Sequence, residues 1–233
     1  TLHTPRTFVP ADLNPGDWAA IAPLFDQLEQ QLSAAADAAQ LEQAILNWEE
    51  LSAAIAEESS KRYIAMTCQT DDKTAEQNYL GFVEKIEPEE KQCSFRLAKA
   101  LSDHPHRDGL PAKRYGVFTR DAALEVELFR PENVALETET AKLGQQYQKL
   151  IGGLSVQFDG EERTLVQMGR YLEETDRARR QETWGLTANR RLEEAETIDT
   201  QLDDLAKRRN QMSANAGFAN YRDFAHRRKG RFD

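Results

Sequence analysis

Hydrophobic residues recur along most of the chain at spacings of three and four, the pattern of a helix with one buried face. The first predicted helix has Asn14 as its N-cap and Pro15 in its first turn, and it runs to about Ala36. Its apolar stripe consists of Trp18, Ile21, Phe25, Leu28 and Leu32. A second helix is predicted over residues 38–68, and its stripe consists of Leu41, Ile45, Trp48 and Ile55.

Prolines and turn residues mark the next boundaries. A third helix is predicted from Asp72, and Pro88 ends or kinks it at Glu87 because proline lacks an N–H and clashes with the preceding turn. We interpret the acidic run 84–90 around this break as a solvated face. Residues 102–119 form the clearest predicted loop. Two shorter helices follow, at about 120–130 and 132–149, separated by Pro131.

Only one segment carries a convincing strand pattern. Residues 154–158 alternate between apolar and polar, Asp159-Gly160 is a tight-turn pair, and residues 163–165 are predicted to pair back. The longest helix is predicted from about Thr175 to residue 216, with a coiled-coil type stripe that needs a facing surface and Gly217 as its C-cap. A short helix is predicted within residues 218–233. The pattern therefore predicts a mainly α fold of antiparallel helical hairpins and long helices, with one small β-hairpin near 154–165.

The composition narrows the classes of partner. Thirty Lys and Arg against forty Asp and Glu give a net charge of −10, the wrong sign for a bulk electrostatic grip on nucleic acid or an anionic membrane. No apolar stretch approaches the ~20 residues that span a bilayer, and residues 1–6 lack the apolar core of a secretory signal. Cys68 and Cys93 are too few for a disulfide scaffold and indicate reduced thiols in a cytoplasmic protein.

The four histidines do not form a zinc-peptidase motif. His3, His104, His106 and His226 include no pair four residues apart, the spacing that His-Glu-x-x-His requires. His104 and His106, with Asp103 and Asp108 beside them, would bind zinc in principle. We favour a polar surface loop, because turn chemistry alone explains this segment.

Three further features have simple structural interpretations. A pairing of Cys68 and Cys93 across a helical hairpin is geometrically allowed. We favour the interpretation that both are small buried hydrophobic residues. Gly152-Gly153 precedes a strand, the wrong order for a phosphate-binding loop, and indicates a turn. The late arginines, such as Arg190, Arg208 and Arg228, are interleaved with acidic residues and indicate an ion-paired, solvated surface rather than a nucleic-acid face.

Two runs of sequence carry a family resemblance. The first is Tyr147-Gln-Lys-Leu-Ile-Gly-Gly-Leu-Ser-Val-Gln-Phe-Asp-Gly-Glu161, followed by residues 165–184, and the second is residues 210–224, ending in Gly230-Arg231-Phe232-Asp233. The two tryptophan helices and residues 62–66 fit the same group. Together they resemble the N-terminal half of the oligoendopeptidase F group, within the thimet oligopeptidase-like zinc metallopeptidases.

The resemblance implies a two-lobed helical peptidase that cleaves short peptides in a deep channel, with zinc held by His-Glu-x-x-His and a downstream Glu. None of those residues is in this chain, so it supplies no catalytic or metal-binding residue, and its substrate-binding residues are unknown. The expected division is a helical hairpin region at 1–103, an oligoendopeptidase F-like domain with the hairpin at 113–184, and the start of the catalytic lobe at 185–233. The expected partners are the C-terminal catalytic lobe and short peptides.

Two alternatives remain. A stand-alone helical interaction module would use the 175–216 stripe to bind a partner helix and would have no chemistry. A nucleic-acid protein would use the Arg-rich tail and show salt-dependent retention on DNA or RNA.

Overall fold

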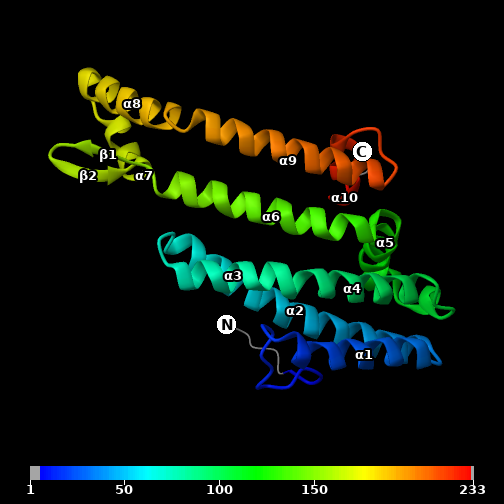
Figure 1. Cartoon of the computed structure of the whole chain (residues 1–233). Coiled ribbons are helices and arrows are strands. Elements are labelled where there is room, and N and C mark those ends of the chain that lie inside the picture. Colours follow the sequence, from blue (N-terminus) through cyan, green and yellow to red (C-terminus); the bar gives the residue numbers. More distant parts are fainter. Residues whose placement is uncertain (1–5, 232–233) are drawn as a thin grey trace.

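The computed structural model describes residues 6–231, and its longer helices lie side by side in one stack (Figure 1). The hairpin, α7 and α8 lie at one end of the stack, and α5 and α10 lie at the other. This confirms the mainly α fold with one small β-hairpin. In chain order the elements are α1 Trp18–Ala34, α2 Ala38–Cys68, α3 Lys73–Lys85, α4 Glu87–Ser102, the 3-10 turn η1 Arg107–Gly109, α5 Ala112–Leu128, α6 Pro131–Gly152, β1 Ser155–Phe158, β2 Glu161–Thr164, α7 Leu165–Met168, the 3-10 turn η2 Gly169–Glu173, α8 Arg177–Leu192, α9 Ala195–Asn215 and α10 Tyr221–Arg228.

The largest core lies between α1, α2, α3, α4 and the first half of α5. The predicted stripes supply it, and several of its side chains are fully buried. Those side chains include Ile21, Leu28, Leu41, Leu97 and Leu101. The apolar periodicity therefore identified the buried faces of the first two helices correctly.

Two smaller cores lie beyond it. One joins the end of α5 to α9 and α10 through Leu128, Met212 and Phe224. The other lies inside a hairpin unit, which we define as β1, β2, α7, η2 and α8, and contains Phe158 and Tyr171. Because these cores do not merge with the first, the hairpin unit depends on its own packing.

Several predicted boundaries are confirmed. The second helix spans the predicted residues, Ala38–Cys68, and is the longest in the structure. The helical assignment is interrupted at Ile86, which lies between α3 and α4, one residue before the predicted break. Pro88 occupies the first turn of α4, where its missing N–H is not needed. The predicted hairpin is present and pairs Ser155 with Thr164 and Phe158 with Glu161, but its second strand begins two residues earlier than predicted and Leu165 begins α7. Gly217 has a positive φ of 83°, which suits a glycine after the last helical residue.

Two predicted boundaries are wrong. Asp17, not Asn14, caps α1, because Asn14 accepts a hydrogen bond from Gly16 in the preceding turn. The predicted loop over 102–119 ends early, and α5 begins at Ala112. The first turn of this helix is held against α2, because Tyr115 is buried and its hydroxyl donates to Glu42 at 2.6 Å.

The helix predicted over 175–216 is interrupted, which is a further correction. α8 ends at Leu192 and α9 begins at Ala195. Arg190 pairs with Glu193 and Glu194 at this break. Apolar spacing continues across the break because it records the direction of side chains, not the continuity of backbone hydrogen bonds.

The N-terminal segment is anchored on one carboxylate of α2. Glu50 accepts backbone N–H bonds from Thr7, Phe8 and Val9 at 2.8–3.2 Å, and Val9 is buried. Burial alone would raise the pKa of Glu50, but the bonds from Val9 and Thr7 outweigh it and lower the pKa. The ionised carboxylate therefore holds this segment against the main core.

Replacing Glu50 with glutamine is expected to reduce the free energy of unfolding by about 1–2 kcal/mol at pH 7, because charge-assisted bonds are lost. Since the folded pKa lies below the unfolded one, this stabilisation is present above the ordinary pKa of 4.5 and is lost at lower pH. Urea unfolding at pH 7 and pH 3.5 measures it. The control is Glu196→Gln on exposed α9, and equal effects of the two substitutions at pH 7 would contradict the assignment.

No helix within residues 6–231 combines the length and the apolar character needed to cross a lipid bilayer.

Candidate functional site

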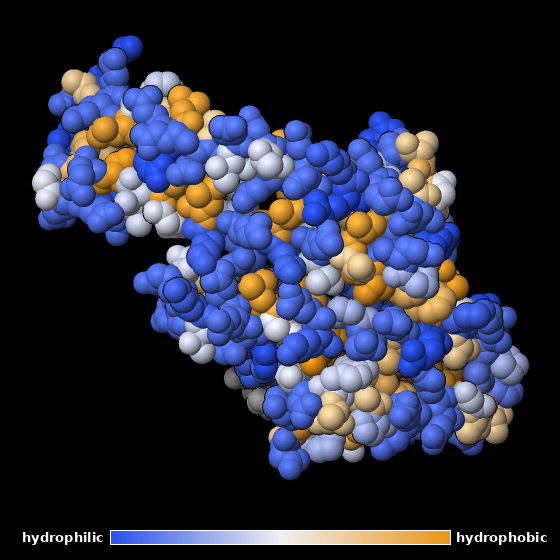
Figure 2. Space-filling model, in the orientation of Figure 1, coloured by the Kyte–Doolittle hydropathy of each residue, from blue (hydrophilic) through white to orange (hydrophobic). Residues whose placement is uncertain are grey.

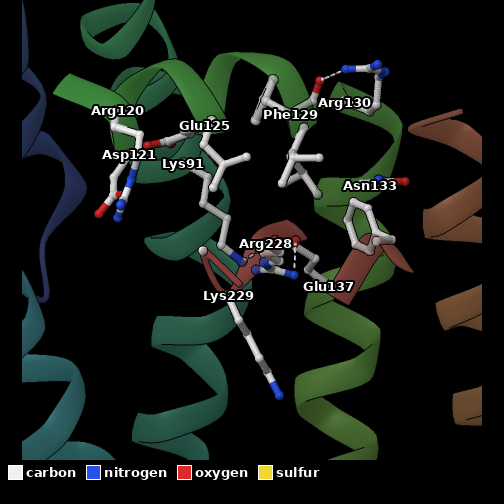
Figure 3. Close-up of a pocket in the computed structure, with 15 residues that line it drawn as sticks. Lys91, Arg120, Asp121, Glu125, Phe129, Arg130, Asn133, Glu137, Arg228 and Lys229 are labelled. Atoms are coloured by element: carbon white, nitrogen blue, oxygen red, sulfur yellow. Dashed lines mark hydrogen bonds and ion pairs between the residues drawn. The ribbon is translucent and has the colours of Figure 1, made fainter. Parts of the chain in front are cut away.

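A cavity of about 460 Å³ lies between α4, α5, α6 and α10 (Figure 3). This volume is within the range of small-molecule sites. Its apolar lining consists of Leu124, Leu128, Phe129, Val134 and Phe224. Charged side chains from all four helices complete the wall. They include Lys91, Glu125, Glu137 and Arg228.

Arg130 fixes the corner between α5 and α6. Its guanidinium donates to the carbonyls of Phe129 at 2.6 Å and Glu127 at 2.9 Å. The Nε atom donates to the Asn215 carbonyl at the end of α9, at 3.1 Å. Pro131 then begins α6 with a φ that suits the first turn. One arginine thus satisfies carbonyls at two helix ends and holds three helices around the cavity.

Ion pairs attach α10 to this frame. Glu137 forms ion pairs with Lys91 of α4 at 2.8 Å and with Arg228 of α10 at 2.9 Å. Arg227 pairs with Glu127 through two nitrogens, at 2.6 and 3.0 Å, and its hydrogen bonds lower the pKa of Glu127. The position of α10 is therefore set by charges as well as by Phe224.

Glu125 is the exception among the carboxylates of the cavity. It forms neither a hydrogen bond nor an ion pair with the described residues, whereas Glu137 is ion-paired and Glu90 nearby accepts a hydrogen bond from Ser94 at 2.8 Å. The pKa of Glu125 is raised to about 7, chiefly by burial and also by the charges of Glu90 and Glu137, while Arg228 opposes the rise. The cavity therefore contains a partly buried carboxyl group that titrates near neutral pH.

Sequence reasoning did not find this site. It singled out Arg228 only as part of a basic cluster, and it interpreted the run that contains Glu90 as a solvated face. That interpretation is wrong for Glu90, which is half-buried and accepts a hydrogen bond from Ser94, and burial raises the pKa of its carboxyl group. The only feature of the local sequence that pointed to a partner for Glu90 was the helical register, which places it four residues before Ser94.

The histidine loop has the structure of a surface turn. The backbone N–H of His106 donates to Nδ1 of His104 at 3.2 Å, so that ring nitrogen is already used. Asp103 and Asp108 each form an ion pair with a neighbouring cation. The structure therefore does not gather the four side chains around a common point.

The described residues do not fit a zinc ion. Within residues 6–231, no three or more His, Cys, Asp or Glu side chains are placed to hold a metal. His226 belongs to α10, and His3 lies outside the described residues.

The remaining candidates have structural roles. Cys93 is buried as predicted, but Cys68 is exposed because it is the last residue of α2, and both thiols are free. Gly152 and Gly153 end α6, so the turn interpretation is confirmed.

The late arginines are largely paired with acidic groups, which confirms the mixed-charge interpretation. Arg208 bonds Glu139 at 2.7 Å, and Arg190, Arg227 and Arg228 are paired as described above. These pairs neutralise much of the basic tail within the chain itself.

Comparison with known proteins identifies the family. The family model for the peptidase M3 N-terminal domain matches residues 8–129. No curated protein sequence matches the chain. Among solved structures, PZ peptidase A with an inhibitor is 26% identical with a TM-score of 0.88, covering 97% of this chain and 40% of that one.

Two further solved structures agree. A putative oligoendopeptidase F is 26% identical, with a TM-score of 0.85 and coverage of 97% of this chain and 40% of that one. A putative oligoendopeptidase F from Bacillus anthracis str. Ames is 22% identical, with a TM-score of 0.88 and coverage of 98% and 42%, and this likeness shows the fold alone. The chain spans about two-fifths of the length of these structures. The chain therefore belongs to the peptidase M3 family and corresponds to the N-terminal part of its members.

Proposed function

We propose that this chain is the N-terminal, non-catalytic portion of a zinc-dependent oligopeptidase and forms one wall of its substrate channel. One observation carries the proposal: the family match lies on an N-terminal domain, and the similar structures are about two and a half times as long. The substrates would be short peptides, because a narrow channel between two lobes excludes folded proteins.

Zinc would belong to the remaining portion. When bound there, it would polarise the scissile carbonyl and activate water. The described residues of this chain do not fit a metal site, so we assign them no part in that step. Residues 185–233 would begin the catalytic lobe, after a helical region at 1–103 and a hairpin-containing domain at 113–184.

Exposed apolar side chains on α8 and α9 support an interface with the remaining portion. Trp184 is 65% exposed, Leu192 68% and Leu202 59%. Figure 2 shows hydrophobic residues gathered over the end of the molecule that carries the hairpin and α8. Large exposed apolar groups on one helical arm are typical of a surface that another body covers.

Replacing Trp184 with alanine is expected to weaken association with a separately produced C-terminal portion at least thirtyfold, since buried tryptophans at interfaces contribute about 2 kcal/mol or more. Titration calorimetry measures the effect. The control is Val117→Ala, an equally exposed apolar residue on α5. Equal affinities for the two variants would exclude Trp184 from the interface.

Sequencing the gene beyond the codon for Asp233 tests the proposal at low cost. A downstream His-Glu-x-x-His supports the peptidase, whereas a stop codon favours a stand-alone helical module.

We also propose a cytoplasmic location, where the exposed thiol of Cys68 stays reduced.

A further inference from the structure

The cavity at α10 presents cationic donors that its own ion pairs do not exhaust. Arg228 and Lys91 each use one nitrogen to bond Glu137. A guanidinium has five N–H donors and a lysine ammonium has three. The two side chains are 49% and 30% exposed, so further donors remain accessible from the cavity.

A carboxyl group without a hydrogen bond lies in the same wall. Glu125 lines the cavity and forms neither a hydrogen bond nor an ion pair with the described residues, whereas Glu137 forms two ion pairs. The charge of Arg228 lowers the pKa of Glu125, so the guanidinium and this carboxyl group are close enough to interact electrostatically. A carboxylate in such a position is stabilised by a cation that enters the cavity.

Apolar surface completes the lining. Leu124, Leu128 and Val134 come from α5 and α6, and Phe224 from α10. Figure 3 shows Lys91, Arg228 and Glu137 converging, with the Arg130 and Asn133 side chains directed away from them. A ligand that fits this lining has an apolar body and two opposite charges.

We propose that this cavity binds a free amino acid or short peptide with apolar side chains, its carboxylate on Arg228 and Lys91 and its ammonium group on Glu125. A simple anion would leave Glu125 desolvated and unpaired, which costs free energy. A simple cation would leave Arg228 and Lys91 paired only with Glu137, without the second anion that their remaining donors can hold. A zwitterion engages both sets of groups and is therefore expected to bind more tightly than either. The proposal concerns binding alone and does not depend on peptide hydrolysis.

The test uses the dipeptide Leu-Leu, its N-acetyl derivative and its C-terminal amide, titrated at pH 8 into the 233-residue chain by amide-resolved NMR. We expect Leu-Leu to shift the signals of Phe129, Val134 and Phe224 at millimolar concentration. Each blocked peptide is expected to bind at least about tenfold more weakly, because one charge-assisted interaction is lost.

Two substitutions test which side chain binds each charged end of the dipeptide. Arg228→Gln is expected to weaken Leu-Leu about tenfold, and Glu125→Gln to abolish the difference between Leu-Leu and its N-acetyl form. Arg191→Gln, on exposed α8, is the matched control and leaves binding unchanged. Because Arg228 also holds α10, Arg228→Lys provides a second variant that keeps the ion pair.

Three results would overturn the proposal: no shifts with Leu-Leu, shifts that map away from the cavity, or equal binding of the free and blocked peptides to the unsubstituted chain. Since none of these readouts involves cleavage, each would leave the proposed peptidase function standing.

Discussion

Replacing Phe158 with alanine is expected to destabilise the hairpin unit by about 3–5 kcal/mol, the usual cost of truncating a buried phenylalanine. Phe158 is 3% exposed and packs on Tyr171, with ring centroids 4.8 Å apart. The Arg179 guanidinium lies over the same ring, at 4.6 Å. The unit has few other buried side chains, so this loss is enough to unfold it locally.

Hydrogen exchange measured by mass spectrometry tests this expectation. Amides of the hairpin and α8 should lose protection, while those of α1, α2 and α4 keep it, because the two cores are separate. The control is Val166→Ala in the same unit, where the side chain is 85% exposed and no effect is expected. Uniform loss of protection along the whole chain would show that the cores are coupled.

Replacing Glu125 with glutamine is expected to raise the free energy of unfolding by about 2 kcal/mol at pH 8. The folded pKa of about 7 lies above the ordinary 4.5, so the folded state keeps its proton where the unfolded state has lost it. Stability therefore falls as the pH rises from 4.5 to 7 and stays lower above that range. Glutamine is uncharged and of similar shape, so the variant does not lose stability as the pH rises.

Thermal unfolding at pH 8 and pH 4.5 measures the effect. The difference between the variant and the original protein should be largest at pH 8 and close to zero at pH 4.5. Glu196→Gln on exposed α9 is the control. A stability gain that does not change with pH would mean that charge burial at Glu125 is not its cause.

The apolar periodicity predicted most of the helices because their stability comes from one buried face. The second helix was predicted with its observed bounds, since Leu41, Ile45 and Trp48 repeat without interruption after Asp37, which caps it. The hairpin was predicted because the pair Asp159-Gly160 favours a tight two-residue turn. In the structure both residues have the positive φ that such a turn requires.

Features that depend on contacts distant in sequence were not predicted. The early start of α5 depends on Tyr115 reaching Glu42, and the interruption after α8 leaves the apolar spacing unchanged. The cavity was missed for the same reason, because Glu137 and Arg228 meet only through the packing of α6 and α10. A helical pattern gives the face of each residue but not its partner on another helix.

The metal content and peptidase activity of the 233-residue chain test the central claim most directly. The measurement is elemental analysis for zinc on the purified chain, together with cleavage of a quenched fluorescent peptide with and without chelator. We expect no stoichiometric zinc and no cleavage from this chain alone. One equivalent of tightly bound zinc with chelator-sensitive cleavage would contradict the assignment of this chain as the non-catalytic portion.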